Sequence, residues 1–506
     1  MSSLSPAAAP EAGADRRPPD LGRDRLLPLG AAVSQLVTFG VVLLLARILK
    51  PQGVGLYIQA YAVLALLSSL CLAGLRGGLS SAVAGRRSAG DEAGLRGTIA
   101  LGLALPTAAA ILCAGLLFAA APSLLRALSM DPRLSDLLRL AAVTLVFHVF
   151  TDCALAATRG FHTTRYFALV SLIVEPVLRL VVTADLLGVG AGIRGALVAL
   201  LASNVVAAIL AGITLWRLLD PVAVRPRYDL RELHVAPVSW LGALATTGLI
   251  WGDVLLVGAL RNSSDAGVYA VATRLVALAA VGLPPVLAAG TPALVRAVGG
   301  RRIADIQHRY ATTTGWMARL ALPGLVALIV LPRDLLALFG PGFAAAATAM
   351  VVLATGKLLD ALTGPTALML TLTGRAPVNV LDNGAVLLLN IGLNLYLIPR
   401  HGILGAGIAW AASIWVLNIA RIVQVWLLTG ILPFSLGVLR ALVAGNAALL
   451  AGLLVSHFLS APWRLPVAVL LLLQAYIAVT AELGLSREES QGWRGLRQQA
   501  THLFAR

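Results

Sequence analysis

The sequence predicts an all-α polytopic membrane protein whose two halves repeat each other. Hydrophobic residues make up 59% of the 506 residues, charged residues only 12%, and the mean hydropathy is +0.88. These values lie outside the usage of soluble domains. Apolar stretches near 20 residues, the length that crosses a hydrocarbon layer about 30 Å thick, occur about 14 times. The stretches lack the alternation of a membrane barrel.

The predicted spans cover most of the chain, and each begins and ends where an apolar stretch does. They are Leu26–Leu49, Val54–Leu75, Thr98–Ala121, Leu137–Ala157, Tyr166–Leu187, Gly195–Leu218, Val238–Leu260, Gly267–Ala289, Thr314–Leu331, Ala344–Ala367, Val378–Ile398, Ile403–Leu428, Leu436–Leu459 and Leu465–Leu483.

An internal repeat with an offset of 210 to 212 residues indicates two equivalent lobes. The matched patches are 55–60 with 267–272, 122–128 with 332–338, and 192–203 with 402–413. Each patch is weak alone because Gly and Ala are abundant, but all three keep the same order and nearly the same spacing. Paired lobes around a site at the bilayer midplane are typical of secondary transporters.

The net charge of +16 follows a membrane pattern and does not indicate a nucleic-acid partner. Arginines gather in the N-terminal tail and in every second loop. The positive-inside rule therefore predicts both termini in the cytoplasm. The polar, proline-rich start of the chain does not resemble a cleavable signal peptide.

These observations divide the chain into six segments. They are a disordered cytoplasmic tail at 1–25, an N-lobe of six spans at 26–218, a cytoplasmic inter-lobe linker at 219–235, a C-lobe of six spans at 236–428, two C-terminal spans within 436–484 and a cytoplasmic tail at 485–506.

Three groups of residues resemble Wzx-like oligosaccharide flippases. The groups are Leu45-Ala46-Arg47 through Gly53-Val54-Gly55-Leu56-Tyr57 to Gly74-Leu75 and Arg86; Asp253 through Gly267-Val268-Tyr269, Ala272, Arg274-Leu275 and Pro292; and Leu338-Phe339-Gly340 through Asn390, Asn394, Leu397-Ile398-Pro399 and Gly405-Ala406. The resemblance covers about residues 26 to 430. It points to the polysaccharide-transporter branch of the multidrug/oligosaccharidyl-lipid/polysaccharide (MOP) exporter superfamily.

The resemblance implies a flippase of the bacterial inner membrane. Its substrate would be a polyprenyl-diphosphate-linked oligosaccharide for O-antigen, capsule or exopolysaccharide, moved by alternating access. Membrane lipid, a polysaccharide polymerase and chain-length machinery would be its candidate partners.

Two other branches of the superfamily stay open as alternatives. Cation-coupled drug and metabolite exporters resemble one another in an acidic residue inside the first helix, which Leu26–Leu49 lacks. The lipid II flippase branch carries an arginine pair and an acidic residue after its second helix, where this chain reads Arg76-Gly77-Gly78-Leu79-Ser80.

Charged side chains near the bilayer centre cost roughly 2.5–3.5 kcal/mol on insertion scales, so each needs a partner, a wet cavity or a role. Glu175 and Arg179 lie one turn apart on one helix, beside Pro176, which frees a backbone carbonyl. They form either a self-neutralising pair or a cavity site at which Arg179 becomes available to a substrate when Glu175 is protonated.

Two further pairs follow from depth and spacing. Asp253 and Arg274 should lie at similar depth on a helical hairpin, as a structural clamp or an anion site. Lys357 and Asp360 are three residues apart on one helix. The substrate-binding candidates are therefore Arg179, Arg274, Arg76 and Lys357, and the pairing or proton-coupling candidates are Glu175, Asp253, Asp360, His148 and Asp152.

His148 and Asp152 could shuttle a proton, because the imidazole titrates near neutrality, or His148 could simply be hydrogen-bonded in the bundle. Arg76 should lie at the cytoplasmic mouth. Snorkelling to the membrane interface would explain the arginines near predicted helix ends. These are Arg47, Arg319 and Arg421.

Arginines in a central cavity suit a diphosphate, since the planar guanidinium binds phosphate oxygens bidentately. A membrane polymerase, ligase or glycosyltransferase is disfavoured, because the longest connection on the predicted outer face is short. We expect no catalytic residue, metal or cofactor: the three cysteines lack metal-ligand spacing and the sequence has no P-loop.

Overall fold

The computed structural model describes residues 26–72, 74–127, 130–219, 224–229, 237–460 and 463–484. Regular structure in these ranges is entirely helical, which confirms the predicted fold class. The predicted tails at 1–25 and 485–506 and much of the predicted linker lie outside the described residues. The helices are α1 Leu26–Leu72, α2 Leu75–Ser88, α3 Glu92–Ala127, α4 Leu134–Gly160, α5 Arg165–Phe167, the π-helical segment η1 Ala168–Val174, α6 Glu175–Gly188, α7 Gly192–Leu218, α8 Pro237–Leu260, α9 Ser263–Ala279, α10 Leu283–Gly299, α11 Ile303–Val330, α12 Pro332–Ala337, the 3-10 segment η2 Phe343–Ala346, α13 Ala347–Thr363, α14 Thr366–Leu372, α15 Ala376–Thr429, α16 Leu436–Phe458 and α17 Arg464–Leu483.

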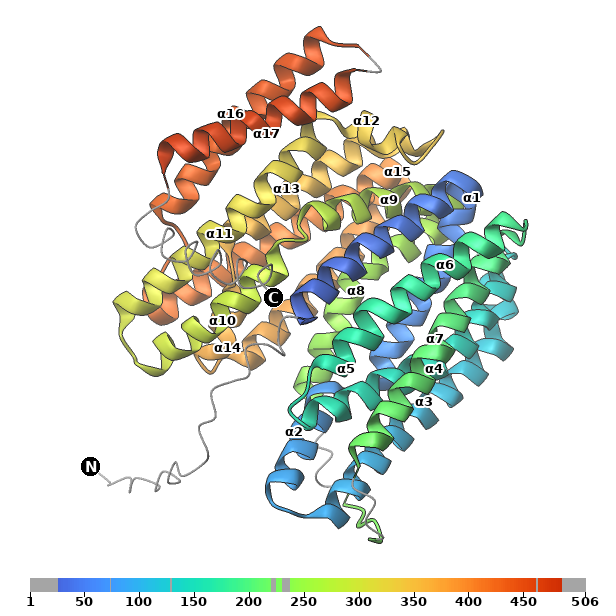
Figure 1. Ribbon diagram of the computed structural model, residues 1–506. Coiled ribbons are helices and arrows are strands. Elements are labelled where there is room, and N and C mark those ends of the chain that lie inside the picture. The colour runs from blue at the N-terminus through green and yellow to red at the C-terminus, as the bar shows by residue number, and fades with distance from the viewer. Residues whose placement is uncertain are drawn as a thin grey trace, which may run out of the picture.

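The helices form two bundles with a pair of helices added on the outside (Figure 1). We refer to helices α1 to α7 as the N-lobe and to α8 to α15 as the C-lobe, following the division predicted from the sequence. The added pair, α16 and α17, packs on α11, where the Tyr476 hydroxyl donates a hydrogen bond of 2.8 Å to the Arg319 carbonyl.

Eleven helices of the described residues are long and apolar enough to cross a membrane, or twelve if α9 and α10 form one bent span. Two of them, α1 and α15, are broken at Lys50 and Gly402, where φ is 59°. With 47 and 54 residues at about 1.5 Å each, either helix is more than twice as long as a hydrocarbon layer is thick. If α1 and α15 each cross the membrane twice, the count of spans rises from twelve to the 14 expected from the sequence. The number 14 stays a prediction.

Two predicted spans are not continuous α-helices. Tyr166–Leu187 is divided into α5, η1 and α6. Gly267–Ala289 bends by 43° between α9 and α10, where Pro284 and Pro285 at the start of α10 cannot donate backbone hydrogen bonds to the preceding turn. Average hydropathy carries no information on such breaks, so the sequence predicts one continuous span in each case.

The internal repeat has a structural counterpart at the contact between the lobes. Gly55 of α1 and Gly267 of α9, matched residues of the first patch, face each other across it. A Cβ atom added at Gly55 would lie 1.6 Å from the Ser263 carbonyl oxygen, and one at Gly267 would lie 2.0 Å from that of Pro51. Gly192 and Gly402, matched in the third patch, share a φ of 59°. The repeated glycines therefore allow the backbones to approach and turn.

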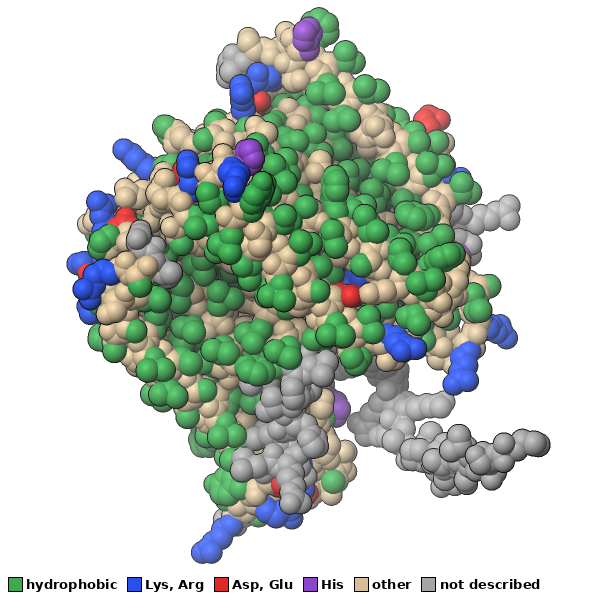
Figure 2. All heavy atoms as spheres, turned by 180° about the vertical axis from the view of Figure 1, so that it is seen from behind, with side chains coloured by type: hydrophobic (Ala, Val, Ile, Leu, Met, Phe, Trp, Pro, Cys, Tyr) green, Lys and Arg blue, Asp and Glu red, His purple; other side chains and the backbone are tan. Residues whose placement is uncertain are grey.

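Apolar side chains cover the middle of the surface, and lysines and arginines gather toward its edges (Figure 2). Leu388, Leu427 and Leu436 are among the exposed residues, each at least 71% accessible. In water such a surface would be costly, whereas a lipid bilayer accepts it. The chain is a multi-pass membrane protein.

Candidate functional site

A cavity of about 280 Å³ opens within the N-lobe. Its walls come from both halves of α1, from α4, from η1 and α6, and from α7. The C-lobe contributes two lining residues, Trp251 of α8 and Arg274 of α9. A ligand in this cavity would therefore touch both lobes.

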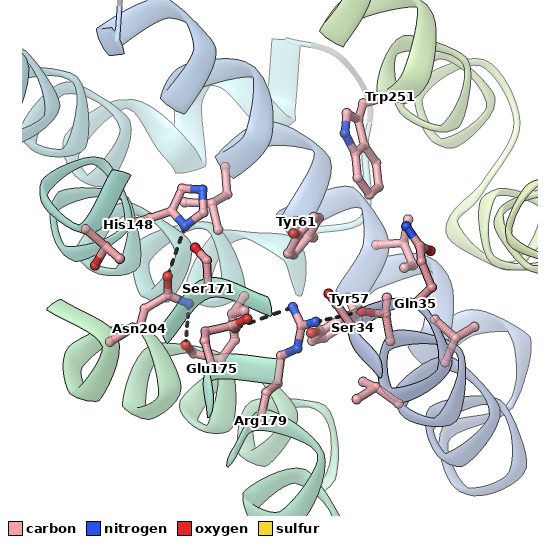
Figure 3. Close-up of a pocket in the computed structure, with 18 of the residues that line it drawn as sticks. Ser34, Gln35, Tyr57, Tyr61, His148, Ser171, Glu175, Arg179, Asn204 and Trp251 are labelled. Atoms are coloured by element: carbon pink, nitrogen blue, oxygen red, sulfur yellow. Dashed lines mark hydrogen bonds and ion pairs between the residues drawn. The ribbon is translucent and has the colours of Figure 1, made fainter. Parts of the chain in front are cut away.

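Arg179 and Glu175 form the predicted pair inside this cavity (Figure 3). Arg179 Nη1 lies 3.7 Å from Glu175 Oε1, and Arg179 Nη2 donates to the Thr38 hydroxyl at 3.2 Å. The Ser203 hydroxyl donates to the same Glu175 oxygen at 3.2 Å. Arg179 is 6% exposed, so its guanidinium is held in a largely desolvated place. The pair lies directly after η1, and π-helical turns often occur at functional sites.

Arg274 has a different environment. Its guanidinium carbon lies 4.0 Å from the centroid of the Trp251 ring, a cation–π contact. Tyr61 of α1 extends the stack, with its ring centroid 5.0 Å from that of Trp251. Among the residues that the structure describes, no carboxylate comes within 4.0 Å of Arg274. Its positive charge is thus available to a ligand.

The predicted Asp253–Arg274 pair is wrong. Asp253 is 3% exposed and accepts hydrogen bonds from the Tyr269 hydroxyl at 3.1 Å and from Asn394 Nδ2 at 2.8 Å. Similar depth on a hairpin does not fix the direction in which a side chain points around its helix. Asp253 points toward α15 of its own lobe, whereas Arg274 points into the N-lobe cavity.

His148 and Asp152 both line the cavity from α4. Asn204 Nδ2 donates to the Leu200 carbonyl, which leaves Asn204 Oδ1 to accept from His148 Nδ1 at 3.0 Å. The other imidazole nitrogen, Nε2, is 3.9 Å from Asp152 Oδ2. The structure therefore shows the hydrogen-bonded histidine, whereas the 3.9 Å to Asp152 is longer than a hydrogen bond; the part of the two residues in proton coupling stays a prediction.

The lining residues are balanced in charge. They include two arginines, Arg179 and Arg274, and two carboxylates, Glu175 and Asp152. The site is therefore less cationic than a row of arginines would be. What distinguishes it is that one cation, Arg274, has no carboxylate partner among the described residues.

The remaining candidates lie elsewhere. Lys357 Nζ is 2.7 Å from Asp360 Oδ2, so this pair forms, but on α13 of the C-lobe, outside the cavity. Arg76 belongs to α2, and its side chain is outside what the structure describes. Snorkelling is wrong for Arg319 and Arg421, which are 5% and 8% exposed.

Three aromatic residues of the cavity were missed, namely Tyr57, Tyr61 and Trp251. The internal repeat could have indicated Tyr57, because Tyr57 and Tyr269 occupy matched positions. Tyr57 lines the N-lobe cavity and Tyr269 binds Asp253 in the C-lobe, so each tyrosine faces the buried polar group of its own lobe.

The apolar helices and the polar cavity among them define a multi-pass membrane protein with an internal polar cavity. Residues 26–298, more than half of the chain, match the family described as Polysaccharide biosynthesis protein, and the chain belongs to this family.

A curated relative is the "Probable flippase AglR" of Haloferax volcanii, 28% identical over 182 residues. The match covers 35% of this chain and only 38% of that protein.

Solved structures share the fold at low identity. Lipid II flippase MurJ in an inward closed conformation has a TM-score of 0.72 at 14% identity, over 90% of this chain and 97% of that one. An inward-facing MATE transporter has a TM-score of 0.67 at 18% identity, over 79% and 95%. A MOP superfamily transporter from Pyrococcus furiosus, described as having a binding pocket of reverse polarity, has a TM-score of 0.55 at 18% identity, over 83% and 95%.

Proposed function

We propose that the chain is a flippase that moves a polyprenyl-diphosphate-linked oligosaccharide across the bacterial inner membrane, with both termini in the cytoplasm. The observation that carries this proposal is Arg274, a cation without a carboxylate partner among the described residues, facing the N-lobe cavity beside Arg179. Membership of the polysaccharide biosynthesis family supports a saccharide substrate, and the name of the Haloferax volcanii relative, a probable flippase, supports the transport step.

In this mechanism the diphosphate enters the cavity while the polyprenyl chain stays in lipid. A diphosphate cannot enter a low-dielectric pathway unless fixed donors replace its water. Arg274 supplies the first cation, since Trp251 covers a face of the guanidinium and leaves the N–H edges for phosphate oxygens.

Arg179 supplies the second cation once Glu175 is neutralised. Protonation of Glu175 removes the attraction across their 3.7 Å separation and frees the Arg179 guanidinium for the substrate. Because the lining has two carboxylates, proton uptake by Glu175 or Asp152 would offset the negative charge that the substrate brings. Rocking of the lobes then exposes the headgroup to the other side of the membrane.

The charge balance also keeps a second candidate function, a cation-coupled drug or metabolite exporter. The two carboxylates of the lining could accept a cationic substrate, and MATE transporters share this fold. Lipid II is a further candidate substrate of the flippase, since the fold is also that of MurJ.

Purified protein in liposomes tests the proposal directly. A fluorescent polyprenyl-diphosphate oligosaccharide should become accessible to a membrane-impermeant quencher faster than in protein-free liposomes. Arg274→Gln should remove this acceleration, and Arg126→Gln should keep it, because Arg126 is exposed and bonds only to residues of its own turn. Export of a cationic dye with no movement of the lipid would favour the exporter instead.

A further inference from the structure

The C-lobe contains a polar cluster on helices that correspond, through the internal repeat, to helices that line the N-lobe cavity. It comprises Lys357 and Asp360 on α13, Asn379 and Asn383 on the first half of α15, and Asn418 and Arg421 on its second half. The repeat matches α7 with the second half of α15, and chain order then matches α4 with α13 and α6 with the first half of α15. These are the elements that carry the polar residues of the N-lobe cavity.

Contacts within this cluster fix the direction of two amides. Arg421 Nη2 donates to Asn379 Oδ1 at 2.6 Å and to Asn383 Oδ1 at 2.7 Å. With both oxygens turned toward the buried guanidinium, the two NH₂ groups are left as donors, and neither makes a hydrogen bond to the described residues. Asn379 and Asn383 are one turn apart, so these donors lie on the same side of α15.

The cluster also contains carboxylate acceptors. Asp360 accepts from Lys357 Nζ at 2.7 Å and from Asn418 Nδ2 at 3.4 Å, and its side chain remains 35% exposed. A charged pair with this exposure would be costly against lipid tails, so its open side should face the wet space between the lobes. Asp382 and Gln424 add a second bonded pair at 2.9 Å.

The chemistry of the cluster selects a neutral, hydroxyl-rich ligand. Its lysine is paired with a carboxylate, and its buried arginine is bonded by two amide oxygens with the carboxylates of Asp360 and Asp382 nearby, so the charges of the cluster balance and favour a neutral ligand over a phosphate. Amide donors next to carboxylate acceptors suit hydroxyl groups, since each hydroxyl both donates and accepts a hydrogen bond.

We propose that this cluster is a carbohydrate subsite that binds the sugars of the headgroup while the diphosphate lies at Arg274 and Arg179 in the N-lobe. This inference rests on the proposed function and extends it: one lobe recognises the charge and the other recognises the sugar. Bonds within the cluster could otherwise serve only to hold α13 and the two halves of α15 together.

Asparagine-to-aspartate variants separate the two roles. Asn379→Asp and Asn383→Asp each retain an oxygen for Arg421 and remove the outward donor. A purely structural contact tolerates this exchange, whereas a sugar oxygen that accepts from the amide loses its N–H donor. Asn446→Asp is the matched control, because Asn446 is an exposed residue of α16 whose amide donates within its own helix.

The experiment compares the Kd values of two probes, a polyprenyl diphosphate and the same lipid carrying an oligosaccharide. We expect each variant to bind the glycosylated probe roughly fivefold to tenfold more weakly, as for the loss of a polar contact. Its Kd for the bare probe should not change, whereas Arg274→Gln should weaken both.

Three other results overturn the subsite in different ways. Equal loss for both probes would assign the cluster a structural role, and no loss for either would show that it does not touch the substrate. If the wild-type protein binds neither probe, the proposed function itself fails, and the subsite with it.

Discussion

Arg179 and Arg274 line one cavity but differ in the charge that they can offer to a ligand. Arg179 is engaged by Glu175 and Thr38, whereas Arg274 lies over Trp251 with no carboxylate within ion-pair distance among the described residues. The N–H edges of Arg274 can therefore bind phosphate without breaking an existing ion pair. Arg179 must first be released, so its contribution depends on the protonation state of Glu175.

We expect Arg274→Gln to weaken binding of a polyprenyl diphosphate about 10- to 100-fold, the effect of losing a charge-assisted hydrogen bond. Arg179→Ala should also stop transport without lowering the amount of protein in the membrane, and Arg179→Lys should keep part of it because the charge survives. The binding affinity is measured on purified protein. Transport is measured by complementation of a flippase-null strain, with expression checked by immunoblot. Full activity of both Arg274→Gln and Arg179→Ala would contradict the mechanism.

A second prediction concerns Asp253, which belongs to a network separate from Arg274. Asp253→Ala removes the acceptor of the Tyr269 and Asn394 hydrogen bonds and should destabilise the C-lobe by about 1–3 kcal/mol. Thermal unfolding of Asp253→Ala, Arg274→Gln and the double variant forms a cycle. The two effects should add within about 0.5 kcal/mol, as for residues that share no partner. A larger coupling would restore the pair that the sequence suggested.

At the scale of elements, departures from regular helix position the site. The π-helical η1 directly precedes Glu175 and Arg179, and the break at Lys50 separates the two halves of α1 that line the cavity. Each break occurs beside a proline: Pro176 follows the start of α6 and Pro51 follows Lys50. A residue before proline is disfavoured in the α region, which fits the extended ψ of 179° at Lys50.

These elements also show what the sequence could reveal. Hydropathy and the repeat predicted the helices and the lobes, and spacing along one helix predicted the Glu175–Arg179 and Lys357–Asp360 pairs, because positions on a single helix share a known geometry. Contacts between helices were out of reach, since they depend on rotation about each helix axis. Asp253 with Asn394, Arg421 with Asn383 and Arg274 with Trp251 are all contacts of that kind.

A third prediction concerns the segment that joins the lobes. Arg227 donates from its backbone to the Ala93 carbonyl at 2.9 Å, and its guanidinium lies 2.5 Å from Asp91, which also binds Arg86. The Gly94 amide and then these two guanidinium groups lower the pKa of Asp91. Because the folded pKa is depressed, the contact should be complete above the ordinary aspartate pKa of about 3.9 and be lost as pH falls through the lower pKa of the folded state.

Limited trypsin digestion at neutral pH tests this contact. Arg225 precedes proline, so the cleavable bond of the described linker segment follows Arg227. We expect Asp91→Asn to speed this cleavage severalfold. Asp136→Asn, which removes an exposed carboxylate paired with Arg194, should leave the rate unchanged. Equal rates in Asp91→Asn and wild type would show that Asp91 does not hold the linker.

At the scale of the whole molecule, the arrangement of charge predicts how the chain is oriented. Arginine-rich loops should lie in the cytoplasm together with both termini. A reporter active only in the cytoplasm should therefore work when fused after Arg506, and one active only outside should work when inserted in the 332–343 segment. The opposite pattern would reverse the orientation, and with it the direction of transport.

The lobes meet through a pair of glycines, an aromatic pair and a hydrogen bond. Gly55 and Gly267 let α1 and α9 approach, Phe39 and Phe339 pack edge to face at 5.6 Å, and Arg47 Nε donates to the Leu338 carbonyl at 2.6 Å. If the protein works by alternating access, these contacts must break in each cycle.

The last prediction is that Gly267→Ala increases the separation of the lobes at the contact between α1 and α9. The new Cβ would lie 2.0 Å from the Pro51 carbonyl oxygen, which is backbone and cannot rotate away. Spin labels at Gln52→Cys and Asn262→Cys, in a background without the three native cysteines, should report a longer distance in Gly267→Ala, with transport reduced. Gly252→Ala is the control, because a Cβ there meets no atom within 4 Å. Since a folding defect would also reduce transport, the distance decides: a monodisperse Gly267→Ala protein with the wild-type distance would show that this contact does not govern the movement of the lobes.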